Sequence, residues 1–529
     1  MKMNLSTDPW IPVVWQNGRP GKISLVEAFQ RGNDIRDLAL RPHERIALMR
    51  LLICVAQAAL DGPNDHQDWK TCLPRIAPAV AAYLRRWHRA FELFGDKQRF
   101  LQVAHLNPAG KTDDDEDEGN SFSKLDLALA TGNNSTLFDN AGGSARSFDP
   151  TQLALMLLTF QCFSPGGRIG VAEWDGKPTL GKGSSDHAPC LAGSMLHSLI
   201  RGATLLETIH LNILDKDTVA VLVAGDTVPT KEQSRVAWGC PSWEQIPSSA
   251  EDTKAVHNTT ATYLGRLLPF TRTIRLQDDG TSMLLANGLK YPPYDQWREP
   301  SCTIVQRKGQ TEGSPWRVLG ASLDRAPWRE LHALTVRRIS RNSNGGPVAL
   351  RNLSSTEPFD LWVGGLAADK AKPLDTVEAV FHMPAKMLID SGQRLYENGV
   401  GYAQELANRL SRAVLNYRKE LGDDLTRREA RDQATKVKNK AASQYWTDIE
   451  REVKRLLDVV ADPISLKDEN EWPRTLWGKV GWTAALRAFD AACPHNTPRQ
   501  LRAFALTRQN FFRSAPPNNL KDKAKEAEA

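Results

Sequence analysis

A glycine loop carries the clearest binding chemistry in this sequence. Residues 164–170 read Ser164-Pro165-Gly166-Gly167-Arg168-Ile169-Gly170 and follow a long apolar stretch. Two glycines after a proline leave the backbone without side-chain shielding and with access to positive φ, so the loop can lie against a bulky partner that a Cβ would keep away. The arginine that follows at once indicates an anionic partner. The alternative is a helix C-cap and turn, because glycine often ends helices.

The sequence lacks the residue patterns of common catalytic and metal sites. It contains no P-loop, no GxSxG elbow, no HExxH motif and no His-Asp pair. Its seven cysteines form no CxxC pair, and the acidic run at residues 111–119 lacks the ligand spacing of an EF-hand. These absences favour a binding or scaffold protein over an enzyme, with no catalytic residues, metal or cofactor.

Length and composition limit the class of protein. A chain of 529 residues exceeds one ordinary core, so about two to four domains are expected. Scattered cysteines fit a reduced, cytoplasmic setting. The N-terminus shows no signal-peptide core, and no apolar run is long enough for a membrane-spanning helix.

Apolar helices and short strands are expected to position the loop. Residues 45–60 and 151–163 are apolar on nearly every side, which predicts two buried helices. Residues 78–94 predict a further helix with arginines on one face, and Asn17-Gly18 predicts a hairpin turn.

Further strands are expected later in the N-terminal domain. Residues 333–339 and 347–352 predict paired strands around Asn344-Gly345. Residues 361–365 and 376–382 predict two more strands, with a projecting loop at 366–373 between them.

The C-terminal part changes to a helical pattern. Helical stretches at about 386–421, 425–461, 470–492 and 497–514 are joined by short breaks, which predicts a four-helix bundle. Four tryptophans are expected in or near its core: Trp446, Trp472, Trp477 and Trp482. The predicted fold class is therefore α+β. It comprises a large mixed domain at 1–385 with irregular loops and short sheets, the bundle at 386–515, and a disordered tail at 516–529.

The positive charge of the chain lies in this C-terminal part. From residue 386 onward there are 26 Lys and Arg against 20 Asp and Glu, whereas the upstream chain has 42 of each. Such asymmetry points to a nucleic-acid surface or to an ordinary solvated helical face.

An ordered series of motifs resembles one family. The opening Asn4-Leu5 with Asp8-Pro9-Trp10-Ile11-Pro12-Val13 is similar to the start of the large subunit of the type I-E CRISPR Cascade complex, the CasA family. Leu52-Ile53-Cys54-Val55-Ala56-Gln57, Leu137-Phe138-Asp139-Asn140, the apolar helix with its glycine loop, and Trp362-Val363-Gly364-Gly365 continue the resemblance in order.

The resemblance implies a non-catalytic sensor of the protospacer-adjacent motif on double-stranded target DNA. In the family the glycine loop lies in the minor groove of the motif, where Gly166 and Gly167 would make the close approach and Arg168 would hold a phosphate or the groove edge. A hairpin tip splits the first base pairs, and Asp369, Lys370 and Ala371 occupy that place. The family carries an Asn-Gln pair there, so this chain departs from the pattern.

The resemblance also implies other contacts. A family lysine that reads the minor groove falls near Thr281, and Lys290 is the substitute a few residues on. The loop with Phe138, Asp139 and Asn140 would dock on the 5′ handle of the guide RNA by stacking and hydrogen bonding. Its alternative is a phenylalanine that anchors its own loop.

The family context supplies the expected partners. They are the guide RNA, the backbone, small and handle-binding subunits of the ribonucleoprotein, and a recruited helicase–nuclease, with no membrane. The bundle would contact the small subunits and displaced strands. The rival hypotheses are a nucleic-acid-processing enzyme with an unrecognised site and a helical scaffold protein.

Overall fold

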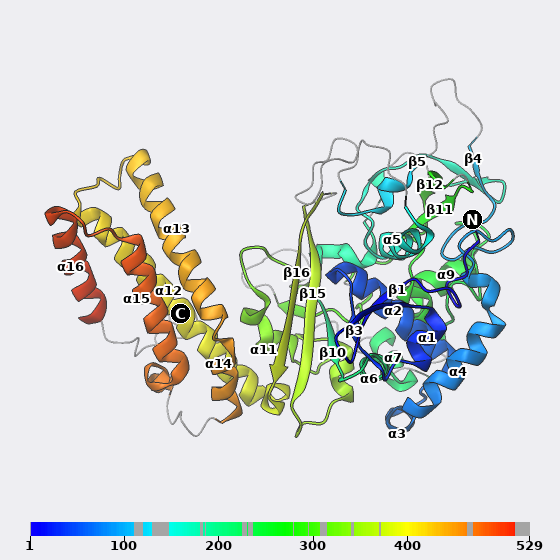
Figure 1. Cartoon of the computed structure of the whole chain (residues 1–529), viewed down its shortest axis with the longest axis horizontal. Coiled ribbons are helices and arrows are strands. Elements are labelled where there is room, and N and C mark those ends of the chain that lie inside the picture. Colours follow the sequence, from blue (N-terminus) through cyan, green and yellow to red (C-terminus); the bar gives the residue numbers. More distant parts are fainter. Residues whose placement is uncertain are drawn as a thin grey trace. The chain divides into compact units, whose positions relative to one another are not determined.

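The chain folds into two compact units of different character (Figure 1). The computed structural model describes the backbone of residues 2–109, 120–129, 148–179, 184–185, 187–224, 230, 236–278, 280–294, 296–306, 315–339, 343–369, 372–462 and 469–513. The N-terminal unit comprises Met1–Pro327, Ala333–Ser354 and Phe359–His382, and the helical unit comprises Trp328–His332, Ser355–Pro358 and Met383–Ala529. The predicted α+β class is confirmed. The acidic run at 111–119 and the tail at 516–529 lie outside the described residues.

A small antiparallel sheet opens the N-terminal unit. β1 (Ile11–Trp15) pairs with β2 (Pro20–Ile23) and with β3 (Ile35–Leu38). Gly18 in the turn has a φ of +80°, a conformation that glycine adopts without steric cost. The predicted hairpin at Asn17-Gly18 is confirmed.

Two buried helices form the centre of this unit. α2 (Pro42–Leu60) and α5 (Pro150–Phe163) pack against each other, and most of their side chains are buried. Both helices are apolar all round because the rest of the unit covers them on nearly every side. The helices predicted at 45–60 and 151–163 are confirmed. The helix predicted at 78–94 begins earlier, as α4 (Leu73–Arg86), and a 3₁₀ turn (His88–Phe91) follows it.

The remaining elements before the long hairpin are short. The helices are α1 (Leu25–Gln30), α3 (His66–Thr71), α6 (Leu205–Asn212), α7 (Lys216–Ala224), α9 (Thr253–Ala261), α10 (Tyr263–Leu267) and α11 (Leu331–Leu334). The strands are β4 (Leu106–Pro108), β5 (Asn120–Ser121), β6 (Gly167–Arg168), β7 (Ala172–Trp174), β8 (Lys177–Pro178), β9 (Ser184–Ser185), β10 (His197–Arg201), β11 (Arg272–Leu276), β12 (Ser282–Asn287), β13 (Ile304–Gln306) and β14 (Trp316–Val318). Besides the first sheet, four strand orders involve only strands named so far: β11-β12-β5, β4-β7-β8, β13-β14 and β6-β9. The fifth is β10-β15-β16, in which β15 is Phe359–Asp369 and β16 is Lys372–Met383.

The long hairpin of β15 (Phe359–Asp369) and β16 (Lys372–Met383) confirms the strands predicted at 361–365 and 376–382. The predicted projecting loop at 366–373 is wrong in extent, because both strands continue into it and only residues 370–371 lie between them. β15 pairs on its other side with β10, so it lies in the middle of its sheet.

The paired strands predicted at 333–339 and 347–352 are wrong. Val348–Asn352 is a 3₁₀ helix, and its first three side chains are all buried, whereas a strand with one solvent face alternates. Gly345 instead forms an isolated bridge with Ile304, with N–O distances of 2.8 and 3.0 Å. Gly345 therefore pairs with β13, and residues 333–339 and 347–352 do not pair with each other around it.

The helical unit contains the predicted four-helix bundle, with one stretch divided. Its helices are α12 (Asp390–Glu420), α13 (Arg428–Glu450), α14 (Val453–Ala461), α15 (Leu476–Ala492) and α16 (Pro498–Arg513). The stretch predicted at 425–461 breaks at Arg451 and Glu452 into α13 and α14. Trp472 and Trp477 are buried, and Trp446 and Trp482 are half-buried, as expected.

A tryptophan from far upstream completes the core of the helical unit. The ring of Trp328 lies 5.8 Å from that of Trp477 and 6.0 Å from that of Trp446. Tyr396 Oη donates to the Trp328 carbonyl at 2.7 Å, and the Arg329 guanidinium lies 3.9 Å from the centre of the Trp446 ring. The core of the bundle is therefore discontinuous in sequence.

We expect Trp328→Ala to lower the free energy of opening of the bundle by about 3–5 kcal/mol, because it leaves a large cavity between aromatic rings. Hydrogen exchange of the α12 and α15 amides measures this. Leu323→Ala is the control, because Leu323 is 51% exposed and its loss should cost less than about 0.5 kcal/mol. Equal exchange in both variants would contradict the role of Trp328.

Candidate nucleic-acid interface

The glycine loop begins directly after α5 and does not use its glycines to cap that helix. Ser164 is the capping residue, with φ −55° and ψ 129°, and its N–H donates to the Phe160 carbonyl at 2.7 Å. Gly166 and Gly167 come two and three residues later. A left-handed glycine cap is therefore not how α5 ends, and the C-cap alternative for these glycines is wrong.

The base of the glycine loop is fixed by buried contacts. Ser164 Oγ lies 3.2 Å from Thr271 Oγ1, and Arg272 Nη2 donates to the Pro165 carbonyl at 2.8 Å. Ala188 N donates to the Ser164 carbonyl at 2.8 Å. Ser164, Thr271 and Arg272 are all buried. The start of the loop therefore has a defined conformation that a partner would not need to impose.

Gly167 and Gly170 lie beyond this base with free space beside them in the described part of the chain. Gly167 has a φ of +150°, which L side chains rarely adopt, and it pairs with Ser185 across β6 and β9. Among the described residues, no atom lies within 4 Å of a Cβ placed on Gly167 or on Gly170. Packing against that part of the protein therefore does not explain why these two positions lack side chains. The open backbone is suited to a close approach by a partner.

One short segment joins the glycine loop to the long hairpin. Ala188 lies at the base of the loop, and the kinked 3₁₀ segment Pro189–Ser194 follows it. Ser194 Oγ accepts from Ala368 N at 3.0 Å and donates to the Ala368 carbonyl at 3.1 Å, near the far end of β15. Ser194 has a φ of +51°, a strained backbone that costs about 1–3 kcal/mol. Loop and hairpin are thus anchored to the same segment.

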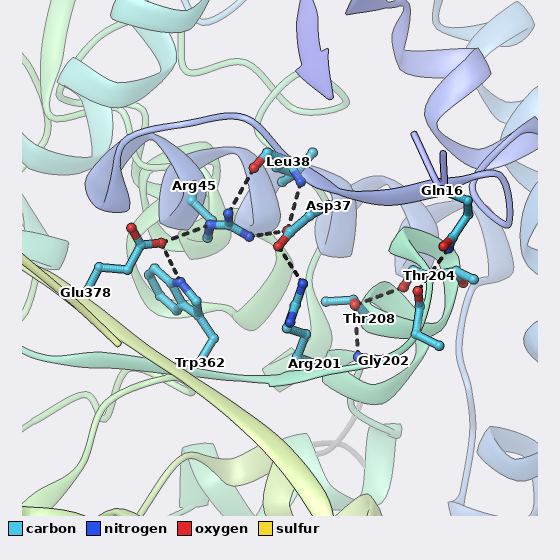
Figure 2. Close-up of polar contacts among 11 residues, drawn as sticks. Gln16, Asp37, Leu38, Arg45, Arg201, Gly202, Thr204, Thr208, Trp362 and Glu378 are labelled. Atoms are coloured by element: carbon cyan, nitrogen blue, oxygen red, sulfur yellow. Dashed lines mark hydrogen bonds and ion pairs between the residues drawn. The ribbon is translucent and has the colours of Figure 1, made fainter. Parts of the chain in front are cut away.

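The root of the hairpin is held by a network of charged groups. Figure 2 shows Arg45 of α2 between Asp37 of β3 and Glu378 of β16. Asp37 Oδ2 also pairs with Arg201 Nη2 at 2.9 Å, and Trp362 Nε1 donates to Glu378 Oε1 at 2.7 Å. Because Trp362 is buried, this network fixes the hairpin to three other elements.

Two buried histidines flank the last residue of α5. The Phe163 ring lies 6.2 Å from that of His43 and 5.8 Å from that of His197, both edge-on. Burial lowers the pKa of His43 to about 3 and that of His197 to about 4. His197 is bonded to Ser301 Oγ at 2.8 Å and to the Cys190 carbonyl at 3.0 Å. At neutral pH both rings are uncharged parts of the core behind the loop.

The other predicted site residues are placed as follows. Asp369 ends β15 and is exposed. Lys290 is exposed two residues after Gly288, whose N–H donates to the Thr271 carbonyl at 3.1 Å. The backbone two residues before Lys290 is therefore bonded to Thr271, which also contacts Ser164 at the base of the glycine loop. Phe138, Asp139, Asn140, Lys370, Ala371 and the side chain of Arg168 lie outside the described residues.

The supporting residues were missed by sequence reasoning. Ala188 and Ser194 lie far along the chain from Thr271 and Arg272, and no local motif connects the two pairs. Within the described ranges, no group of three His, Cys, Asp or Glu residues is arranged to hold a metal. No helix in those ranges is long and apolar enough to cross a membrane.

We expect the free energy of unfolding to fall as the pH is lowered from about 6.5 toward 4. In that window the unfolded chain protonates His43 and His197 while the folded chain does not, so acid favours unfolding. The slope is at most about 1.4 kcal/mol per pH unit for each histidine. No nitrogen of His43 has a hydrogen-bond partner among the described residues, so His43→Leu should raise stability at pH 5 relative to wild type. Denaturant titrations across this range measure the slope, and an equal change for the exposed His105→Leu would contradict the assignment.

Comparison with known proteins identifies the family. The family model of CRISPR-associated protein Cse1 matches residues 4–487. CasA/Cse1 of Thermus thermophilus is 28% identical over 547 residues, covering 97% of each chain. The crystal structure of Thermus thermophilus CasA has a TM-score of 0.72 at 24% identity, covering 97% of this chain and 99% of that one. Cse1 from Acidimicrobium ferrooxidans gives 0.72 at 18% identity, covering 98% and 99%. A chain of a CRISPR RNA-guided surveillance complex gives 0.68 at 17% identity, covering 97% and 99%. The chain belongs to the Cse1 family of CRISPR-associated proteins, also called CasA.

Proposed function

We propose that this chain is the non-catalytic large subunit of a CRISPR RNA-guided surveillance complex, where it recognises the protospacer-adjacent motif on duplex DNA. The observation that carries the proposal is the common anchoring of the glycine loop and the hairpin on the segment from Ala188 to Ser194. Family membership supports the assembly, since a related fold occurs in a CRISPR RNA-guided surveillance complex.

The glycine loop is the proposed minor-groove reader. The minor groove is narrow and its base code is degenerate, so bare backbone fits where side chains do not. Gly166 and Gly167 make the close approach, Arg168 holds a phosphate or the groove edge, and Lys290 adds a cation. The fixed base at Ser164 and Pro165 limits the ordering that binding would require.

The hairpin tip is the proposed wedge. Asp369, Lys370 and Ala371 enter under the motif and separate the first base pairs. Strand exchange between guide and target is nearly balanced in free energy, so the subunit only needs to nucleate it, and no ATP hydrolysis is required.

The remaining proposed contacts fix the subunit in its assembly. The loop with Phe138, Asp139 and Asn140 docks on the 5′ handle of the guide RNA. The bundle contacts the small subunits and the displaced strand through sequence-independent phosphate contacts. The subunit also contacts the backbone and handle-binding subunits and supports recruitment of a helicase–nuclease. The complex acts in the cytoplasm.

The double variant Gly166→Asp/Gly167→Asp tests the minor-groove reader. Two carboxylates at the groove add steric bulk and negative charge, so we expect motif-dependent binding by the reconstituted complex to fall at least tenfold, or about 1.4 kcal/mol. Competition between duplexes that differ only in the flanking motif measures this. Gly18→Asp is the matched control, because Gly18 also has a positive φ and open space around its Cα. If the double variant keeps its motif preference, the assignment fails.

The triple variant Asp369→Gly/Lys370→Gly/Ala371→Gly tests the wedge. Removing its side chains should leave initial motif binding intact but slow strand separation about tenfold, because only opening needs an inserted tip. A fluorescent base analogue beside the motif reports opening. Equal loss of binding and opening would indicate that the tip reads the motif instead.

A further inference from the structure

An arginine cluster at the end of α4 has no place in the proposed motif site. The cluster is Arg85, Arg86 and Arg89, with Trp87 and His88 between them. All three arginines are exposed, and Trp87 is half-buried. None of the three forms an ion pair with a carboxylate in the described parts of the chain, and the structure records only the guanidinium of Arg86 lying 5.5 Å from the Trp87 ring centre.

Several other arginines in the same unit are paired with carboxylates. Arg75, on the first half of α4, pairs with Asp68, and Arg41 pairs with Glu44 at 2.6 Å. Arg31 lies 3.9 Å from Asp34 even at a well-exposed turn. Cations near a helix C-terminus do interact favourably with the helix dipole, by about 0.3–1 kcal/mol. That effect falls off within the last turn, so the dipole of α4 does not account for Arg89, which lies beyond α4 in the 3₁₀ turn His88–Phe91.

A rigid support presents the cluster to solvent. α4 buries Ile76, Val80 and Leu84, which lie on one face at intervals of one turn. That face packs against α1 and α2, and Figure 1 shows α4 on the outside of the unit beside α1. The N-terminal segment before β1 is bonded to the 3₁₀ turn that follows α4, through Asn4 Nδ2 donating to the His88 carbonyl at 2.9 Å. The backbone that carries the arginines is therefore held from both sides.

We propose that this arginine cluster is a second DNA contact, which binds the phosphates of duplex DNA without reading its sequence. Three guanidinium groups within five residues supply the charge complementarity that a phosphate backbone requires. Single-stranded nucleic acid is bound instead by cations combined with free aromatic faces on which bases stack. Trp87 does not offer such a face, because it packs into the core at 6.5 Å from Tyr83 and lies under Arg86. The cluster thus fits phosphates of a double helix better than unpaired bases.

The test compares the salt dependence of binding in the full chain. A labelled duplex of arbitrary sequence is titrated between about 50 and 200 mM salt with wild type and with Arg85→Ala/Arg86→Ala/Arg89→Ala. We expect the slope of log K against log salt to become shallower by about two to three, roughly one for each lost phosphate contact. The variant Arg85→Lys/Arg86→Lys/Arg89→Lys keeps the charges and should keep most of the slope.

The control removes the same charge elsewhere. Arg19, Arg36 and Lys254 are exposed and scattered over the same unit, and their triple alanine variant should leave the slope nearly unchanged. An equal loss in this control, a loss confined to single-stranded RNA, or no duplex binding by wild type would each overturn the proposal. In the reconstituted complex, Arg85→Ala/Arg86→Ala/Arg89→Ala should keep the preference between duplexes that differ only in the flanking motif, because phosphate contacts carry no sequence information. Gly166→Asp/Gly167→Asp should lose that preference, so failure of the motif reader and failure of the cluster are distinguishable.

Discussion

A buried carboxylate between two arginines holds the centre of the N-terminal unit together. Glu299 is 1% exposed and pairs with Arg50 of α2 at 2.9 Å and with Arg266 of α10 at 2.7 Å. Burial alone would raise the pKa of Glu299, but the two guanidinium groups lower it to about 2. Their remaining donors bond to backbone carbonyls of Arg266, Leu267, Thr260 and Pro292. Such a triad contributes little net stability when complete, but breaking it costs about 3–5 kcal/mol, because charges remain buried without partners.

The hairpin and the glycine loop both depend on the chain that this triad fixes. Ser301, two residues after Glu299, bonds His197 through its hydroxyl and Ser198 through its carbonyl. Those two residues begin β10, which pairs with β15 along its length. His197 also bonds the Cys190 carbonyl, in the segment that joins loop and hairpin. The position of both projections is thus determined by buried polar contacts, each of which is costly to leave unsatisfied.

An element of this fold could be predicted from the sequence where the residues that determine it are close together along the chain. α2 and α5 follow from uninterrupted apolar runs, and β15 and β16 from β-branched and aromatic residues on either side of a polar turn. The false strands at 333–352 had suitable residues, but Pro347 donates no N–H and the three residues after it are all buried. Arg50 and Glu299 are 249 positions apart, and Trp328 enters a bundle that starts after the hairpin. Partners of that kind are selected by the tertiary fold, and no spacing rule reveals them.

The two proposed DNA contacts would have different roles: the arginine cluster would raise the affinity for every duplex, and the glycine loop would discriminate between motifs. Phosphate contacts add nearly the same free energy to every duplex, so the arginine cluster changes the affinity for all sequences and leaves their ratio unchanged. Discrimination must then come from contacts at the groove. A fixed backbone is an advantage at the groove. A loop that adapts to each sequence would lose less binding free energy on an incorrect motif, so it would discriminate less well between motifs. The strained Ser194, its two bonds to Ala368 and the buried base of the glycine loop all oppose such adaptation. Rigidity at the root of the loop and openness at Gly167 are therefore complementary requirements for the same task.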